Sequence, residues 1–303
     1  MSELGYNACR RFPHLGRDVV RRFVPAGPVS LWLGDAHYDV TRRALVMGIL
    51  NRTRDSFYSP AATFDIDGFL SRAQQLVAQG ADLLDVGGVK AGPGQEVSED
   101  EELERVVPAI ELLRQRFDVP VSVDTWRAGV AAASFAAGAC VGNDISGFAD
   151  PDYLRVAAAA GASVVATHIR LRPRVADPSP HYDDVTQTVI EYLSQRRHRA
   201  IDAGIAPQRV ILDAGLDLGK TAGQSLQLLR DSDRLAALGP LLLSASNKTF
   251  LGVLFDLDVL ERREASLSAT ALGVVAGCRV LRVHDVQGTV RVRDALERVM
   301  EFA

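Results

Sequence analysis

The sequence has few cysteines, and they form no recognisable pattern. Cys9, Cys140 and Cys278 lie far apart, without a CxxC pair or the spacing of a mixed Cys/His metal site. This spacing argues against both a structural zinc site and a disulfide framework. We therefore expect reduced cysteines that serve as packing residues.

Long hydrophobic runs are also missing. No uncharged apolar run reaches the roughly 18 residues needed to cross a bilayer; the longest candidate, residues 128–142, is rich in Ala and Gly and ends in a strand-like segment. The first 28 residues carry five arginines but no apolar core like that of a signal peptide. We expect a cytoplasmic protein without membrane contact, whose residues 1–28 form a basic N-terminal extension.

The sequence also lacks an excess of charge of one sign. The 34 basic residues are spread among 38 acidic ones, for a net charge of −4, so the chain has no electrostatic footprint for nucleic acid. A small-molecule partner is the better prediction. With 303 residues, 47% of them hydrophobic, residues 29–303 have the length of one α/β barrel of about 250 residues.

Strand-like runs alternate with segments of helical periodicity along the whole chain. The eight strand-like runs are residues 44–50, 82–86, 119–123, 139–144, 163–167, 209–212, 240–244 and 279–283. The helical segments are residues 66–79, 100–117, 127–137, 153–160, 184–203, 225–237, 264–276 and 290–302. Eight such alternations are typical of a closed parallel barrel, so we predict an α/β fold of the (β/α)8 TIM-barrel type.

Two further patterns describe the ends of this barrel. Before the first strand, residues 29–33 and 38–41 flank a Gly34-Asp35 turn and predict a β-hairpin that plugs the barrel floor. Polar residues instead gather directly after the strands, which is the end of a TIM barrel where chemistry takes place. We therefore place the functional site at the carboxyl ends of the strands.

The segment from Asp213 to Thr221 invites comparison with a phosphate-binding loop, because it ends in Gly-Lys-Thr after an apolar strand. The phosphate-loop motif requires a glycine five residues before Gly219, where this chain has Ala214. The spacing therefore argues against a nucleoside triphosphatase.

Side chains at different strand ends form the candidate ligand pocket. Each of these carboxylates could simply cap the following helix, but a closed barrel brings them all around one mouth. Several acceptors and an amide would suit a flat heterocycle with an amino group and ring N–H donors, and Lys248 could bond a ring carbonyl. The acceptors and the amide are Asp85, Asp124, Asn143 and Asp213.

The last strand contributes a second group. Arg282 and His284 alternate along it, so both side chains point to the same side of that strand. An arginine and a histidine at a strand end can form an anion site together with Asn51.

These residues resemble the signatures of the dihydropteroate synthase family. Residues 46–57, V-M-G-I-L-N-R-T-R-D-S-F, are similar to the family's first-strand signature. The later signatures follow in the family's order, at residues 82–88, 122–125, 143–145, 213–220, 246–248 and 282–285. The resemblance runs from about residue 29 to the C-terminus and covers all eight strands.

The resemblance implies a pterin site made of Asp85, Asp124, Asn143, Asp213 and Lys248, of which Asp124, Asp213 and Lys248, with Arg282, would be catalytic. It also implies that Asn51, Arg282 and His284 hold the pyrophosphate of the dihydropterin, with Asn51 touching Mg²⁺. The implied reaction replaces that pyrophosphate with the amine of p-aminobenzoate, and a homodimer is implied as well. Lys90, Leu218 and Ser246 would form the wall for the second substrate.

The chain departs from the family's pattern in its loops. The family's Gly-Gly-Glu-Ser-Thr-Arg-Pro-Gly is here Gly-Gly-Val-Lys-Ala-Gly-Pro-Gly at residues 87–94, and its Val-Thr-Pro is Arg-Thr-Arg at residues 52–54. In the motif Asp-Pro-Gly-Phe-Gly-Phe-Gly-Lys the two aromatics are Leu216 and Leu218. Lys90 or the two loop arginines could supply the lost charge, although lysine does not match arginine's bidentate geometry.

These departures resemble those of the divergent second copy of the synthase found in actinobacteria. They predict a retained pterin floor, a rebuilt wall for the second substrate, and weak or altered activity. Three alternatives stay open: a non-catalytic pterin-binding or regulatory paralogue, a transferase that uses a different amine, and a pterin-dependent methyltransferase on the same barrel. The Asn51 loop signature and the Arg-x-His pair argue against the last.

Overall fold

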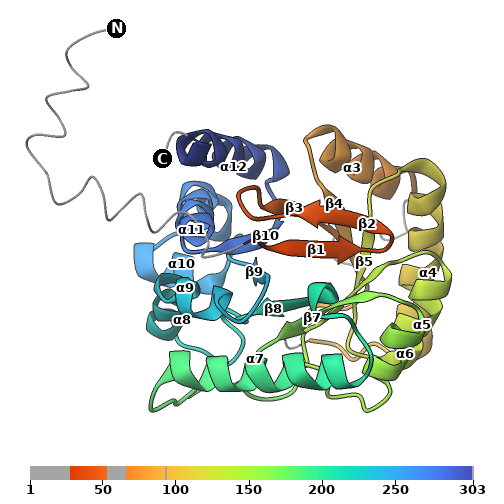
Figure 1. Cartoon of the computed structure of the whole chain (residues 1–303), viewed down its shortest axis with the longest axis horizontal. Coiled ribbons are helices and arrows are strands. Elements are labelled where there is room, and N and C mark those ends of the chain that lie inside the picture. Colours follow the sequence, from red (N-terminus) through yellow and green to blue (C-terminus); the bar gives the residue numbers. More distant parts are fainter. Residues whose placement is uncertain (1–27, 53–65, 93, 302–303) are drawn as a thin grey trace, which may run out of the picture.

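The computed structural model describes residues 28–52, 66–92 and 94–301. Eight parallel strands close into one barrel in the order β10-β3-β4-β5-β6-β7-β8-β9, and helices surround it (Figure 1). The predicted TIM barrel is therefore confirmed. The predicted N-terminal extension lies outside the described residues, apart from its last residue.

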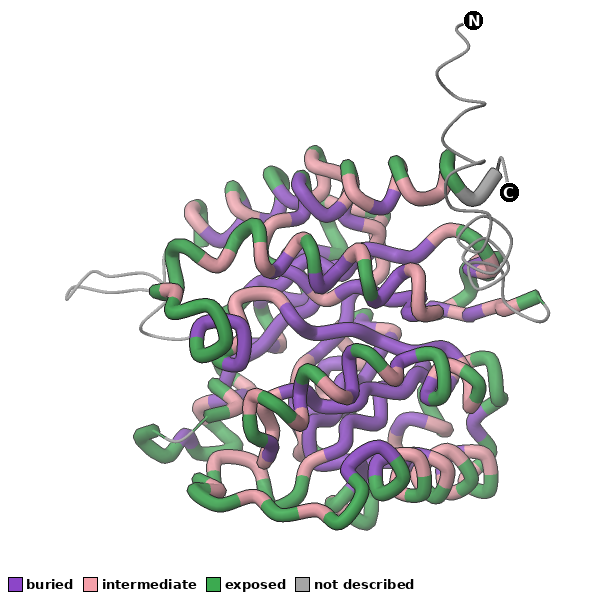
Figure 2. Tube along the Cα trace, turned by 90° about the vertical axis from the view of Figure 1, so that its left-hand side faces the viewer, coloured by how far each residue is buried: buried purple, intermediate pink, exposed green. Residues whose placement is uncertain are grey.

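The barrel strands are β3 (Leu45–Asn51), β4 (Leu83–Gly87), β5 (Val121–Asp124), β6 (Val141–Asp144), β7 (Ser163–Thr167), β8 (Val210–Asp213), β9 (Leu241–Leu243) and β10 (Cys278–Val283). The main helices are α3 (Ile66–Ala78), α4 (Glu99–Arg116), α5 (Ala128–Ala136), α6 (Tyr153–Ala159), α7 (Val185–Asp202), α8 (Ala222–Arg230), α11 (Arg263–Val275) and α12 (Val286–Glu301). Helices cover the outside and side chains fill the inside, so the strands are apolar on both faces. Figure 2 shows the buried strands at the centre and the exposed residues on the outer faces of the helices.

The predicted hairpin consists of β1 (Ser30–Leu33) and β2 (Ala36–Asp39), which pair antiparallel. Leu31 and Leu33 are buried with residues from the first halves of the barrel strands, among them Leu45 and Leu83. The Ser163 hydroxyl, at the start of β7, also donates to the carbonyl oxygen of Trp32 at 2.5 Å. The hairpin therefore plugs the amino-terminal end of the barrel, and burial of each leucine stabilises it by about 2 kcal/mol.

The turns at this lower end are tight, as the Gly-Ala breaks in the sequence indicate. After α3, Gly80 has a φ of +95° and its N–H donates to Val77, while the N–H of Ala81 donates to Leu76. This pattern ends the helix through a left-handed residue, a conformation that favours glycine.

The last helix returns to the same lower end. Arg43, just before β3, pairs through Nη1 with Glu297 at 2.7 Å and with Asp294 at 3.2 Å, both near the end of α12. Helix α12 begins after Asp285, whose Oδ1 accepts from the N–H of Gly288 at 2.8 Å. This cap explains why the helix starts four residues before the predicted residue 290.

Other boundaries also differ from the predictions. The helix expected at residues 225–237 is divided into α8 and α9 (Ser232–Ala236), with Asp231 between them. After β9 the chain adds α10 (Thr249–Phe255). The described residues also contain two short 3-10 turns: η2 (Pro207–Arg209) directly before β8 and η3 (Val259–Glu261) just before α11. Among the residues described here, no helix is both long and apolar enough to span a membrane.

Candidate active site

The bottom of the ligand pocket at the barrel mouth, which we call the floor, is a largely buried ionic cluster at the end of the barrel opposite the hairpin. Arg282 of β10 bonds through Nε to Asp85 Oδ2 at 2.6 Å and through Nη2 to Asp124 Oδ2 at 2.7 Å. The amide of Asn143 donates to the same Asp85 oxygen at 3.2 Å. Three of the predicted pterin residues, from β4, β5 and β6, therefore belong to one network: two aspartates pair with the guanidinium, and Asn143 bonds to one of them.

This cluster contains more carboxylate than it can neutralise. Two aspartates share one arginine, and Asp85 Oδ1 is buried with no hydrogen-bond partner among the described side chains and backbone. Burial raises the pKa of Asp124 to about 7, against the opposing charge of Arg282 and with help from Asp85. Although burial lowers the pKa of Arg282, the charges of Asp85 and Asp124 raise it above the ordinary value. The floor therefore favours a partner that brings N–H donors or positive charge.

Asp213, on β8, and Lys248, on the segment between β9 and α10, come from the other side of the barrel. Asp213 ends β8, and its Oδ1 accepts from the N–H of Gly215 at 2.8 Å. Burial raises the pKa of Asp213, while the charges of Lys248, Lys220 and Arg282 oppose that shift. Desolvation lowers the pKa of Lys248, opposed by the charges of Asp217 and Asp213. The charges of Asp213, Lys248 and Arg282 thus influence one another's protonation.

Lys220, the lysine of the segment that resembles a phosphate loop, is held by groups of its own loop and of the loop after β7. Its ammonium is buried and bonds to the carbonyl oxygens of Gly215 at 2.8 Å and Leu218 at 3.0 Å, and to His168 Nδ1 at 2.9 Å. Burial and the Lys220 charge lower the pKa of His168 to about 2, so the imidazole is neutral. The pair holds the loop after β8 in place. Only the position of His168 after a strand hinted at it in the sequence.

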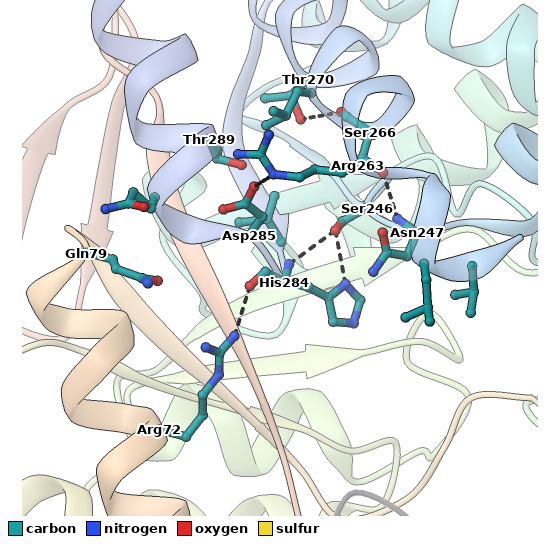
Figure 3. A pocket seen from close by; sticks show the side chains of 15 residues that line it. Arg72, Gln79, Ser246, Asn247, Arg263, Ser266, Thr270, His284, Asp285 and Thr289 are labelled. Carbon is teal, nitrogen blue, oxygen red and sulfur yellow. Dashed lines mark hydrogen bonds and ion pairs between the residues drawn. The ribbon is translucent and has the colours of Figure 1, made fainter. Parts of the chain in front are cut away.

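His284 lies at the rim, beyond the end of β10. Ser246 Oγ contacts its Nδ1 at 3.0 Å and accepts from its backbone N–H at 3.2 Å, and Arg72 donates to its carbonyl oxygen at 3.1 Å (Figure 3). These residues line a cavity of about 430 Å³ that Arg263 also borders. Desolvation, followed by the charges of Arg282, Lys248 and Arg72, lowers the pKa of His284 to about 4, although the residue keeps exposed surface.

The three residues of the predicted anion site are distributed between floor and rim. Arg282 is committed to two aspartates in the floor, whereas His284 lies at the rim, close enough for the Arg282 charge to lower its pKa. Asn51 is exposed at the end of β3. A Cβ placed on Gly87 would lie 3.4 Å from Asn51 Oδ1 and 3.7 Å from Asp124 Oδ2, so Asn51 flanks the floor. Sequence reasoning missed Arg72 and Arg263, because their helices carry no motif.

The residues predicted to wall the second substrate lie on three loops. Leu218 borders a cavity of about 210 Å³ between the loops after β4, β7 and β8. Ser246 contacts His284, and Lys90 is exposed on the loop after β4. That loop is attached to the loop after β7 by Arg174, whose guanidinium donates to the carbonyl oxygens of Lys90 at 3.0 Å and Gln95 at 2.5 Å.

Arg52, one of the arginines that could replace the charge missing from the loop after β4, packs against α3 instead. The guanidinium of Arg52 is buried and lies 5.3 Å from the ring centroid of Phe69 in α3. This contact packs it against the helix layer, so the charge does not face the wall at Leu218. Arg54, the other candidate, lies outside the described residues.

Comparisons with known proteins agree with this geometry. Residues 47–284 match the family described as pterin binding enzyme. The chain is 44% identical over 264 residues to inactive dihydropteroate synthase 2 of Mycobacterium leprae, covering 85% of this chain and 91% of that protein. It is also similar to a Yersinia pestis dihydropteroate synthase solved with a sulfonamide drug complex, at a TM-score of 0.84 and 36% identity over 91% of this chain and 100% of that one. A Xanthomonas albilineans dihydropteroate synthase solved with 4-aminobenzoic acid is also similar, with a TM-score of 0.83 and 34% identity. That match covers 90% of this chain and 98% of the other.

Proposed function

The chain belongs to the pterin-binding dihydropteroate synthase family, and on that premise we propose that it binds a dihydropterin pyrophosphate and condenses it slowly with an aryl amine. The observation that carries the pterin assignment is the floor cluster of Asp85, Asp124 and Asn143 on Arg282. A pterin ring offers an amino group and ring N–H donors, which are what a buried acceptor without a partner requires.

In the proposed complex each floor residue has a separate task. Asp85 Oδ1 and Asp213 accept from the ring donors, Asn143 fixes the ring's orientation, and Lys248 donates to the ring carbonyl. Asp124 and Asp85 also place negative charge beside the ring. That charge stabilises the cation that forms as the methylene carbon loses its bond to the pyrophosphate oxygen.

In the proposed reaction the aryl amine replaces the pyrophosphate on the methylene carbon of the pterin. The pyrophosphate leaves with the electron pair of the broken C–O bond, the aryl amine forms the new C–N bond, and the amine gives its proton to the released pyrophosphate or to water. Asn51, Arg282 and His284 receive the anion, and Arg72 adds a cation beside His284. His284 is neutral at pH 7 because its pKa is about 4, so it contributes hydrogen bonds and the arginines supply the charge.

We also propose that Mg²⁺ takes part, held by few protein ligands. The described residues contain no group of three or more His, Cys, Asp or Glu side chains that could hold a metal. Mg²⁺ is often held by one or two protein oxygens, water and substrate phosphates. The exposed amide oxygen of Asn51 fits that pattern, and a bound Mg²⁺ would neutralise pyrophosphate charge there.

One observation favours a second candidate function, a pterin-binding protein without turnover. The loop after β4 has lost the family's hydroxyls and arginine, and Arg174 joins it to the neighbouring loop at Lys90, Ala91 and Gln95. A loop held in this way keeps pterin access but supplies no new group to the second substrate. The M. leprae relative is named an inactive dihydropteroate synthase, which agrees with this candidate.

A homodimer and a cytoplasmic location complete the proposal. The homodimer is supported by exposed apolar side chains on α10, η3 and α11, because large exposed apolar groups are typical of association surfaces. They are Val253, Phe255, Val259, Leu260 and Leu272.

Two measurements test the proposed function. Calorimetry with 6-hydroxymethylpterin should give binding that Asp213→Ala weakens. Pyrophosphate release from the dihydropterin pyrophosphate with p-aminobenzoate and Mg²⁺ should be slow but dependent on the amine. Absence of pterin binding refutes the proposal, whereas binding without amine-dependent release selects the second candidate.

A further inference from the structure

Asp217 occupies an unusual position in the wall beside Leu218. It lies in the turn after β8 with a φ of +68°, in the left-handed region that favours glycine. Asp enters this region more readily than most residues, but still at a cost in backbone energy. The family motif quoted above has glycine here.

The carboxylate of Asp217 is fixed by backbone donors. Its Oδ2 accepts from the N–H of Thr249 at 2.5 Å, and the N–H of Phe250 lies 3.2 Å from Oδ1 and 3.3 Å from Oδ2. Its own N–H donates to Ser225 at 3.1 Å. Thr249 and Phe250 begin α10, so the carboxylate caps the amino terminus of that helix. Asp217 also borders the cavity at Leu218, which places its negative charge beside the wall proposed for the second substrate.

The positive charges nearby are less available to an incoming anion. Lys220 borders the same cavity, but its ammonium donates to the carbonyl oxygens of Gly215 and Leu218. Lys248 is already opposed by Asp217 and Asp213. The guanidinium of Arg174 donates to backbone carbonyl oxygens, and Arg170 is paired with Asp177. Arg172 borders the cavity at Leu218, but it is exposed and solvent screens its charge, whereas Asp217 is half-buried.

We propose that Asp217 determines the specificity for the second substrate by disfavouring aryl amines that carry a carboxylate and admitting uncharged ones. The inference rests on the proposed function, because it concerns the site beside a bound pterin. p-Aminobenzoate is an anion at neutral pH, and its carboxylate would approach a charge that cannot turn away. An amide in place of that carboxylate removes the repulsion and keeps the size of the ligand.

The test measures binding of p-aminobenzoate and p-aminobenzamide to the full chain saturated with 6-hydroxymethylpterin, pyrophosphate and Mg²⁺, a mixture that cannot react. Calorimetry should give an amide affinity about tenfold above that of the carboxylate, the size expected for two like charges several ångströms apart at a partly solvated site. Asp217→Asn keeps a capping oxygen but removes the charge, and should bring the ratio towards one through tighter carboxylate binding. Asp217→Gly, which suits the backbone, should act in the same direction.

Two controls separate charge from structure. Arg172→Gln and Asp177→Asn change charges that border the same cavity and should leave the ratio within about twofold, because solvent or pairing already screens them. Raising the salt concentration from about 0.02 M to about 0.5 M should shrink the ratio in the unmodified protein, an effect that a purely structural cap would not produce.

Each contrary result is informative. Equal or tighter binding of the carboxylate, a ratio that Asp217→Asn leaves unchanged, or binding of neither amine overturns the role of Asp217 while pterin binding persists. Loss of pterin binding itself overturns the proposed function and this inference together.

Discussion

Arg282 allows the sharpest test of the floor cluster, through its replacement by Met. Methionine keeps much of the volume of the side chain but leaves Asp85 and Asp124 buried together without their shared guanidinium. Breaking a buried pair by removing one partner costs about 3–5 kcal/mol of folding free energy. We expect a loss in this range at pH 8.5.

The loss should depend on pH in a defined direction. Asp124 has a folded-state pKa of about 7, above the unfolded value of roughly 3.9. A raised carboxyl pKa means that the folded state holds a proton that the unfolded state releases, so stability falls as pH rises through this window. Without Arg282 the pKa rises further and the window extends above 7. At pH 5.5 Asp124 is protonated in both proteins, so the loss there should be smaller by about 2 kcal/mol, at 1.4 kcal/mol per pH unit.

Urea unfolding at pH 5.5 and pH 8.5 measures this difference. The matched control is Arg155→Met, which removes an exposed pair with Asp152 and should change stability by less than about 0.5 kcal/mol at either pH. An Arg282→Met loss that is equally large at both pH values would refute the assignment of the raised pKa to Asp124. No loss at all would refute the cluster.

The remaining predictions concern other parts of the protein. Asp213→Ala should weaken pterin binding by about 1–3 kcal/mol in calorimetry, because it leaves ring donors unpaired; unchanged affinity would remove Asp213 from the site. Because His168 has a folded pKa of about 2 against roughly 6.5 unfolded, stability should fall as pH drops below 6.5, by up to 1.4 kcal/mol per unit, and His168→Gln should flatten that slope in acid urea titrations. Placing Glu-Ser-Thr-Arg at residues 89–92 should raise turnover with p-aminobenzoate, on the order of 10²-fold, more than it changes pterin affinity; a wild-type rate equal to that of an ordinary family member would contradict the loop argument. Leu260→Asp should dissociate the proposed homodimer in analytical ultracentrifugation, since Leu260 is 93% exposed in the single chain; an unchanged sedimentation coefficient would place any interface elsewhere.

The barrel could be predicted from sequence because its signals are local and repeated. Each strand is a short apolar run followed by helical periodicity, and the plug is a hairpin with Gly34 at its turn, where φ is +58°. Boundaries were wrong where a long-range or capping contact decides them. Asp285 starts α12 early, and α10 begins where Asp217, thirty-two residues away in sequence, accepts from Thr249.

The sequence could predict which side chains lie at the ends of the strands, but not which of them contact one another. The order of the motifs predicted that Asp85, Asp124, Asn143 and Arg282 lie at one mouth. The alternation of side chains along β10 could not predict that Arg282 points into the floor while His284 lies at the rim. Arg174 and Arg72 belong to no motif, because their roles arise only when distant loops meet. Their contacts with Lys90 and His284 span 84 and 212 residues.

The plugged lower end of the barrel also determines how this protein can be handled. Strand β1 begins there, and the pairing of Arg43 with Asp294 and Glu297 brings the last turns of α12 to the same side. Both ends of the described chain therefore lie on the side opposite the mouth. A biotin tag or fusion partner at either end would orient the protein on a sensor surface with its pocket facing the flowing solution, so pterin and amine binding can be followed on immobilised protein.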